Sequence, residues 1–173
     1  MRKMLPDLVL RTTFITGFPG ETEEQFQTLI EFVKRHKFER MGVFTYSFEA
    51  DTPAAKIEGH VDDEVKEDRR NRLMAVQQEI MFEYNQSQVG KLVDVILDQP
   101  VEGQPGVWIG RGSCDAPDVD GITFVTQTEH ELKEGQIVEC EIVASQGYDL
   151  IAAAVGEPRD GKPVPRGLNI IPT

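Results

Sequence analysis

The stretch that decides the fold is FITGFPGETEEQF, from Phe14 to Phe26. An apolar run rich in β-branched residues, PDLVLRTTFIT over 6–16, ends there at a Gly-Phe-Pro-Gly turn. Because the run shows no clean alternation, it predicts a parallel strand that is covered on both faces. After the turn, Thr22 and Gln25 have the spacing of a capping box, which marks the first residues of a helix. A strand, a tight turn and a helix are therefore expected in immediate succession.

A second strand and a long helix follow. Residues 39–49, ERMGVFTYSFE, form another apolar run, so strand, helix and strand make a βαβ unit with a parallel sheet. Residues 51–60 read as a loop, and an amphipathic helix runs from Asp62 to a C-terminal Gly90. A single βαβ unit with two strands cannot by itself cover both faces of a parallel sheet. This half is therefore expected to be the end of a larger α/β domain. The predicted apolar stripes are Phe26, Leu29, Ile30 and Val33 on the first helix and Val65, Leu73, Val76, Ile80 and Tyr84 on the second.

The turn GFPGE over 17–21 has two interpretations. It lacks the Lys and Ser/Thr of a P-loop and the G-x-G-x-x-G spacing of a dinucleotide site. Ligands bind at the carboxyl ends of strands in parallel sheets, where Gly17 would allow close approach and Pro19 would stiffen the loop. The alternative is a purely structural turn between a strand and a helix. The residues alone leave both interpretations open.

The second half has a different character. Five short segments separated by Gly, Pro and Asp turns predict a small antiparallel β-barrel. We place the domain boundary near Ser87, which gives a first domain over 1–86 and a barrel over 87–155. The Pro- and Gly-rich tail, 156–173, is expected to be poorly ordered. The five predicted strands cover 91–99, 107–112, 120–126, 135–145 and 148–155.

Charge and composition restrict the function. The net charge is −12, and from Ser87 onward 6 basic residues stand against 14 acidic ones, a net of −8. This argues against non-specific binding to nucleic acid and favours a basic partner or simple solubility. No apolar run approaches the roughly 20 residues of a membrane span, and we see no signal peptide. With only Cys114 and Cys140, expected to be free structural thiols, a reducing cytoplasm is the expected compartment.

Several blocks of sequence resemble one enzyme family in their order and spacing, from about residue 11 to 155. They are RTTFITGFPGETEEQF, GVFTYSFEADTPAA, RLMAVQQEI and CDAPDVDG, and they are similar to the radical S-adenosylmethionine methylthiotransferases. Arg11–Thr13 and 42–47 are most similar to the RimO branch, which modifies an aspartate of a basic small-subunit ribosomal protein, whereas sister branches modify tRNA adenosines. The resemblance implies an α/β plus all-β fold. It would contain the C-terminal part of a partial TIM-like radical barrel and a small OB-like TRAM domain.

The resemblance also implies a cofactor pocket at the carboxyl ends of the two strands. Phe44 and Tyr46 would flank the adenine of S-adenosylmethionine, and Arg11 would meet its methionine carboxylate. For the aromatic residues, packing in a core is the alternative. The remaining residues expected near the cofactor are Thr13, Thr16, Gly17, Phe18 and Pro19.

The chain departs from the family in one respect. Radical chemistry there needs a C-x-x-x-C-x-x-C motif whose thiolates hold a 4Fe-4S cluster. Cys114 and Cys140 do not form such a motif, and the domain that holds a second cluster in the family is missing from this sequence. We therefore expect S-adenosylmethionine and 4Fe-4S clusters only in an intact parent enzyme. The chain alone is expected to be inactive.

The acidic barrel suits a basic ribosomal protein as docking partner, with the ribosome as a further candidate and RNA as a less favoured one. We expect docking through Trp108, Arg111, Asp118 and Asp120, although Trp108 could be a core residue. Asp115, Asp118 and Asp120 have the spacing of a cation loop, but a turn with Asx-type hydrogen bonds is the preferred reading. The run DDEVKEDRR is read as a solvated helix face. The alternative functions are a non-catalytic RNA- or protein-binding module and a tRNA-modifying sister enzyme.

Overall fold

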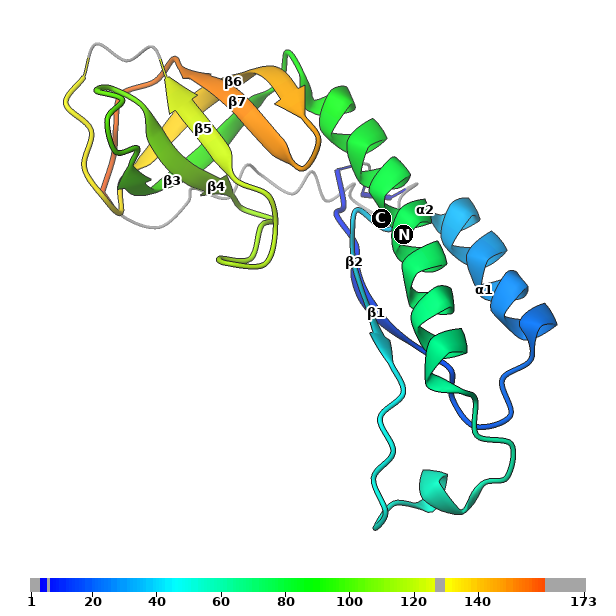
Figure 1. Cartoon of the computed structure of the whole chain (residues 1–173). Coiled ribbons are helices and arrows are strands. Elements are labelled where there is room, and N and C mark those ends of the chain that lie inside the picture. Colours follow the sequence, from blue (N-terminus) through cyan, green and yellow to red (C-terminus); the bar gives the residue numbers. More distant parts are fainter. Residues whose placement is uncertain (1–3, 6, 127–129, 161–173) are drawn as a thin grey trace. The chain divides into compact units, whose positions relative to one another are not determined.

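The computed structural model describes residues 4–5, 7–126 and 130–160 (Figure 1). The chain divides into two compact units, Met1–Tyr84 and Asn85–Thr173. Among the described helices, none has both the length and the apolar character that crossing a membrane requires.

The first unit contains the expected βαβ arrangement. Strands β1 (Arg11–Thr16) and β2 (Arg40–Thr45) pair in parallel, and α1 (Glu23–His36) connects them. Both strands are shorter than the apolar runs predicted. The expected loop contains a short 3-10 helix, η1 (Pro53–Lys56), before the long helix α2 (Asp63–Gln88).

Helix α1 begins where the capping box predicts. The Thr22 hydroxyl accepts a hydrogen bond from the Gln25 backbone N–H at 3.2 Å, and the Gln25 side chain accepts one from the Thr22 N–H at 3.0 Å. Two backbone donors at the helix start are thereby satisfied. The helix ends at Lys37, which adopts a left-handed conformation and donates its N–H to the Val33 carbonyl at 2.8 Å.

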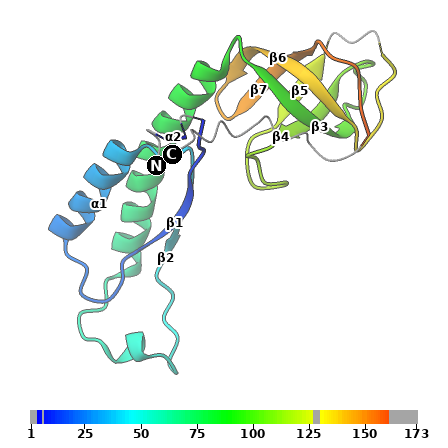
Figure 2. The ribbon, with the colours of Figure 1, turned by 180° about the vertical axis from the view of Figure 1, so that it is seen from behind.

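The core of the first unit lies on one face of the two-stranded sheet. Figures 1 and 2 show α1 and α2 on the same side of β1 and β2. On the other face, the side chains of Ile15 and Phe44 are 57% and 64% exposed. The prediction of strands covered on both faces is therefore wrong for the described residues, because both helices pack on the same face. The buried core residues are Phe26, Ile30, Val33, Met41, Val43, Leu73 and Ile80.

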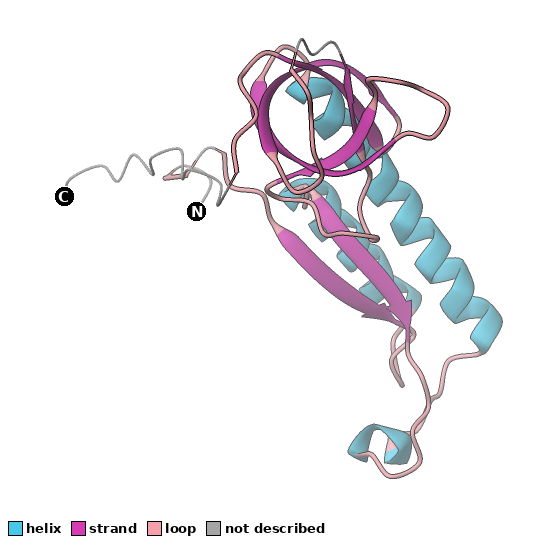
Figure 3. Cartoon of the chain, turned by 90° about the vertical axis from the view of Figure 1, so that its left-hand side faces the viewer, coloured by secondary structure: helices cyan, strands magenta, loops and turns pink. Residues whose placement is uncertain are grey.

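The second unit is a closed barrel with the strand order β3-β4-β5-β7-β6, seen along its axis in Figure 3. Four neighbouring pairs are antiparallel, but β5 and β7 run parallel, so the expectation of a purely antiparallel barrel is wrong at this pair. A parallel neighbour needs a long connection, and here β6 lies between the two strands in the sequence. The strands are β3 (Leu92–Pro100), β4 (Trp108–Gly112), β5 (Thr123–Thr126), β6 (Ile137–Gln146) and β7 (Asp149–Ala154).

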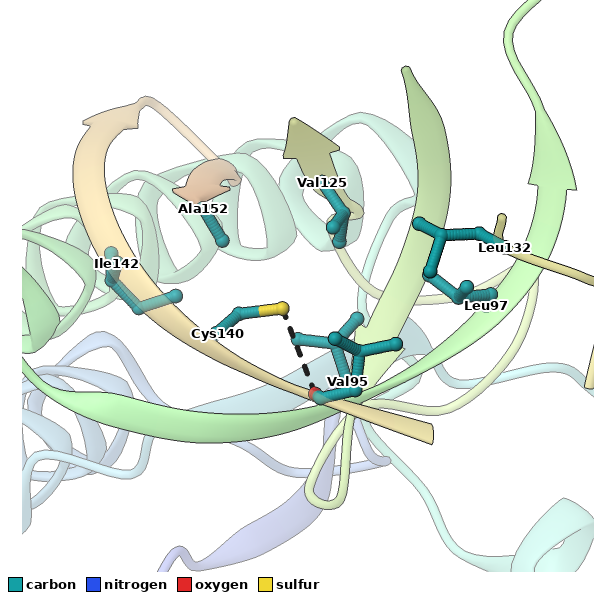
Figure 4. Close-up of a cluster of buried hydrophobic side chains, with 8 residues drawn as sticks. Val95, Leu97, Val125, Leu132, Cys140, Ile142 and Ala152 are labelled. Carbon is teal, nitrogen blue, oxygen red and sulfur yellow. Dashed lines mark hydrogen bonds between the residues drawn. The ribbon is translucent and has the colours of Figure 1, made fainter. Parts of the chain in front are cut away.

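The barrel interior is filled by small and branched apolar side chains around Cys140 (Figure 4). The Cys140 thiol is buried and donates a weak hydrogen bond to the Val138 carbonyl, with 3.6 Å between sulfur and oxygen. Burial raises the pKa of this thiol to about 12, and the charges of Asp94 and Glu139 add to the shift. Cys140 is thus a packing residue, and both cysteines are free, as expected.

The start of the C-terminal tail pairs with the barrel. Arg159 forms a backbone bridge with Ile137, and its guanidinium meets Asp94 at 2.7 Å. The N–H of Gly156 donates to the Glu139 carbonyl at 3.1 Å. The expectation of a poorly ordered tail is therefore wrong for 156–160, because backbone pairing and an ion pair hold this segment. Residues 161–173 lie outside the described part of the chain.

Candidate functional site

The loop after β1 has a backbone that only glycine can adopt at one position. Gly17 has a φ of +74°, and a Cβ atom built on it would collide with the side chain of Lys66. Such a φ value is strained for other residues. The N–H of Glu21 donates to the Phe18 carbonyl at 2.9 Å, and the N–H of Gly20 donates to the Gly59 carbonyl at 2.8 Å. The positive φ of Gly17 and its close approach to Lys66 therefore explain this glycine without a bound ligand.

A buried ion pair fastens this loop to α2. One carboxylate oxygen of Glu21 accepts a hydrogen bond from the Gly17 N–H at 2.8 Å and from the Arg69 guanidinium at 2.7 Å. The same guanidinium nitrogen donates to the Glu21 carbonyl at 3.1 Å. Arg69 also lies over the ring of Phe26, 5.6 Å from its centre. Because the Glu21 carboxylate binds both the Gly17 N–H and the Arg69 guanidinium, the pair ties the loop to the helix.

The run DDEVKEDRR does not form a uniformly solvated helix face. Lys66 and Arg69 are buried, whereas Val65, which was predicted on the apolar stripe, is exposed. The reason is ion pairing, of Lys66 with Asp63 at 2.8 Å and of Arg69 with Glu21. Apolar periodicity cannot detect charged residues whose stems pack inward. Sequence analysis missed these residues, because Glu21 and Arg69 stand 48 positions apart.

Aromatic rings gather at the carboxyl ends of the two strands. Phe18 meets Tyr46 edge-on, with 5.4 Å between ring centres, and His60 stacks on Tyr46 at 6.3 Å. Phe48 meets His60 at 5.3 Å. Rings arranged in this way offer flat apolar surfaces beside polar groups. Next to them is an open hollow of about 440 Å³, lined by Thr45, Tyr46, Ser47, Phe48, Asp63, Lys66 and Glu67.

Tyr46, one of the residues that line this hollow, carries an unsatisfied polar atom. Its hydroxyl is buried and has no hydrogen-bond partner among the described residues. The Lys66 ammonium lies 5.7 Å from the centre of the Tyr46 ring. A buried hydroxyl without a partner is uncommon in native proteins and calls for an explanation, such as a bound ligand. The flat rings and the hollow fit an adenosyl group such as that of S-adenosylmethionine.

The predicted cofactor residues fall into separate groups. Thr13 and Phe44 lie on the exposed face of the sheet, and Phe18 and Tyr46 lie together at the carboxyl end. Arg11 is the first residue of β1, about 17 Å of strand away from Thr16 at roughly 3.3 Å per residue. Thr16 is buried, and its hydroxyl lies 3.4 Å from the Phe44 carbonyl and 3.5 Å from the Lys66 carbonyl, while Gly17 and Pro19 form the buried base of the loop.

The predicted docking residues of the barrel differ in their surroundings. Trp108 is half-buried against the barrel core, and Arg111 pairs with Asp98 at 3.2 Å. The Asp120 carboxylate accepts the Ala116 N–H at 2.6 Å, so a side chain holds the segment as a turn, but the bond reaches four residues back and is not the Asx type that was expected. Asp118 remains exposed, with a left-handed φ of +60°.

The residues of the chain do not fit an iron–sulfur cluster. Within the described residues, no three His, Cys, Asp or Glu side chains come together in a way that could hold a metal ion. The sequence has two cysteines, and both lie in the barrel unit. A 4Fe-4S cluster is held by cysteine thiolates, usually four of them. No step of a radical reaction can therefore be derived from this chain.

Comparison with known proteins confirms the resemblance that the sequence blocks predicted. Residues 89–155 match the TRAM domain, so the barrel is a TRAM domain. The chain is 47% identical over 154 residues to "Ribosomal protein uS12 methylthiotransferase RimO" of Lachnoclostridium phytofermentans, which covers 89% of this chain and 34% of that protein. Proteins of the same name match at 48% identity in a Synechococcus strain (91% and 33% covered) and in Carboxydothermus hydrogenoformans (87% and 34%). The chain spans about a third of the length of these relatives.

Proposed function

We propose that the chain is the C-terminal part of a RimO-type methylthiotransferase, an enzyme that adds a methylthio group to an aspartate of ribosomal protein uS12. The observation that carries this proposal is the 47% identity to a RimO protein across 89% of the chain. The order of a βαβ unit and a TRAM barrel supports it. In this proposal the first unit contributes to the cofactor pocket, and the barrel docks the protein substrate.

The first unit would bind S-adenosylmethionine at the carboxyl ends of β1 and β2. Phe18 and Tyr46 would lie against the adenine ring. Gly17 lets the backbone approach the ligand, and the Glu21–Arg69 pair holds the loop still. When bound to a cluster in an intact enzyme, S-adenosylmethionine supplies the radical chemistry. Thr13 and Phe44 would form the neighbouring wall on the exposed sheet face.

The charge of the barrel supports a protein substrate. From residue 87 onward, 6 basic and 14 acidic residues give a net charge of −8. A domain that binds the nucleic-acid backbone needs clustered Lys and Arg. A negative domain instead attracts a basic ribosomal protein and raises the rate of productive encounter.

A chimeric enzyme tests the proposal. The segment of the Lachnoclostridium phytofermentans RimO that matches this chain is replaced by the chain, and uS12 is analysed by mass spectrometry after the reaction. We expect the chimera to methylthiolate the uS12 aspartate. The same chimera with Gly17→Val should not, because the loop cannot form around Lys66.

The proposal is overturned by a chimera that folds and holds its iron–sulfur clusters but leaves uS12 unmodified. Modification of tRNA by that chimera would point to the sister enzymes instead. Measuring both substrates in one assay separates these outcomes.

A further inference from the structure

The most exposed large apolar side chain in the described part of the barrel unit lies in the loop between β4 and β5. Val119 is 75% exposed, at the tip of the segment Asp115–Gly121. Single exposed apolar residues are common, and they need a second feature before they indicate a binding surface. Here the second feature is a fixed aromatic neighbour.

Tyr148 is that neighbour. It lies in the turn between β6 and β7, and its side chain is 43% exposed. Gly121, two residues after Val119, packs so closely on Tyr148 that a Cβ atom built on Gly121 would overlap the Tyr148 carbonyl. The two loops are therefore in direct contact at Gly121 and Tyr148, and each carries an exposed apolar or aromatic side chain, Val119 on one and Tyr148 on the other.

Hydrogen bonds hold both loops in place before any partner binds. The Ile122 N–H donates to the Asp149 carboxylate at 3.0 Å, and the Leu150 N–H donates to the Ile122 carbonyl at 2.9 Å. The turn itself is fixed by Asn85, whose buried amide donates to the carbonyls of Gly147 and Tyr148, each at 3.0 Å. A surface that is ordered in advance loses little entropy on binding.

Asp118 gives this surface its charge. It is exposed, has a left-handed backbone, and makes no hydrogen bond or ion pair that the structure shows among the described residues. A left-handed residue other than glycine costs backbone energy. The carboxylates of Asp115 and Asp120 accept backbone N–H groups of the same loop, whereas that of Asp118 faces the solvent.

We infer that Asp118, Val119 and Tyr148, here called the tip surface, form the contact of the barrel with a basic segment of its protein partner. The aliphatic stem of a Lys or Arg side chain would pack on Val119, and its charge would meet the face of Tyr148 and the Asp118 carboxylate. This inference rests on the proposed function for the identity of the partner. It assigns docking to Val119 and Tyr148, which sequence analysis did not single out, and keeps Asp118 from the predicted set.

The experiment measures binding of recombinant uS12 from Lachnoclostridium phytofermentans to the full 173-residue chain by calorimetry at two salt concentrations. Val119→Ser should raise the dissociation constant about tenfold, as expected when an apolar contact worth about 1.4 kcal/mol is lost. Asp118→Asn keeps a residue that tolerates the left-handed backbone, and should weaken binding about threefold, mainly at low salt. Matched controls are Val143→Ser, another exposed valine of the barrel, and Glu102→Gln, which removes one exposed charge elsewhere.

The outcomes separate the two proposals. Loss of affinity in Val119→Ser and Asp118→Asn, with controls within about twofold of wild type, supports the tip surface. If the wild-type chain binds uS12 and all four variants bind equally well, the tip surface is wrong and the proposed function stands. If the wild-type chain does not bind uS12, or binds tRNA instead, docking by this barrel is wrong and the tip surface with it. Melting curves establish that each variant is folded.

Discussion

The two units solve the problem of sheet edges in opposite ways. The five-stranded barrel closes on itself, so every strand has two neighbours. Within residues 4–5, 7–126 and 130–160, the two-stranded sheet of the first unit has no further strand at either edge, and Ile15 and Phe44 are exposed on one of its faces. Open edges and apolar faces invite contact with further chain or with a ligand, whereas closure removes them. The barrel therefore satisfies its own strand edges, whereas the first unit offers unpaired edges and an apolar face for further contacts.

The largest expected effect breaks the first unit and leaves the barrel intact. Arg69→Ala removes one partner of a buried ion pair and leaves the Glu21 carboxylate uncompensated. Breaking such a pair costs about 3–5 kcal/mol of unfolding free energy. Denaturant unfolding followed by fluorescence of Trp108, in the barrel, and by far-UV circular dichroism should then show helix loss before barrel loss.

Arg70→Ala is the matched control for that experiment. Arg70 pairs with Glu67 on the surface of the same helix, and an exposed pair contributes about 0–1 kcal/mol. Equal destabilisation by both substitutions would contradict the role given to the Glu21–Arg69 pair. Loss of both signals in one transition would show that the units unfold together.

The next largest effect belongs to the barrel. Leu97→Ala empties a fully buried position in the barrel core, and such a change costs about 2–5 kcal/mol. The Trp108 transition should move to lower denaturant, while the helical signal of the first unit stays in place. Leu92→Ala, on the exposed side of the same strand, should change the midpoint little. If Leu97→Ala leaves the Trp108 transition unmoved, the closed core does not carry the stability of the barrel.

The smallest expected effect is a pH dependence of stability that belongs to the barrel alone, through Cys140. The pKa of the Cys140 thiol is about 12 in the folded barrel against an ordinary value of 9.0, so the unfolded chain releases this proton first as pH rises. The folded barrel therefore loses stability above pH 9, by up to about 1.4 kcal/mol per pH unit. Unfolding curves at pH 8 and pH 10 should show this loss in wild type and a smaller one in Cys140→Ala. Identical pH dependence in the two proteins would contradict the raised pKa.

The parts of the fold that depend on local signals could be predicted from the sequence. The capping box at Thr22, the βαβ order and the five strands of the barrel each follow from neighbouring residues. The parallel pairing of β5 and β7 could not be predicted, because it depends on the way the barrel closes. The burial of Lys66 and Arg69 was missed because their partners or their packing lie far away in the sequence.

In the candidate site, too, the position could be predicted from the sequence but the detailed contacts could not. The resemblance directed attention to the carboxyl ends of the strands, where Phe18 and Tyr46 do meet. It could not show that the Tyr46 hydroxyl lacks a partner, or that Arg11 lies at the other end of its strand.

The alternation of buried and exposed residues along β1 could not be seen in the sequence, because threonines occupy both faces of this strand.

Asn85 sets the point at which this barrel could be transplanted. The TRAM match begins at residue 89, but the amide that fastens the β6–β7 turn comes from Asn85, in the last turns of α2. A barrel cut at residue 89 would leave the carbonyls of Gly147 and Tyr148 without this donor, at a cost of about 1–3 kcal/mol. Exchanges of barrels between relatives should therefore be joined upstream of Asn85, so that the helix end travels with the domain whose turn it holds.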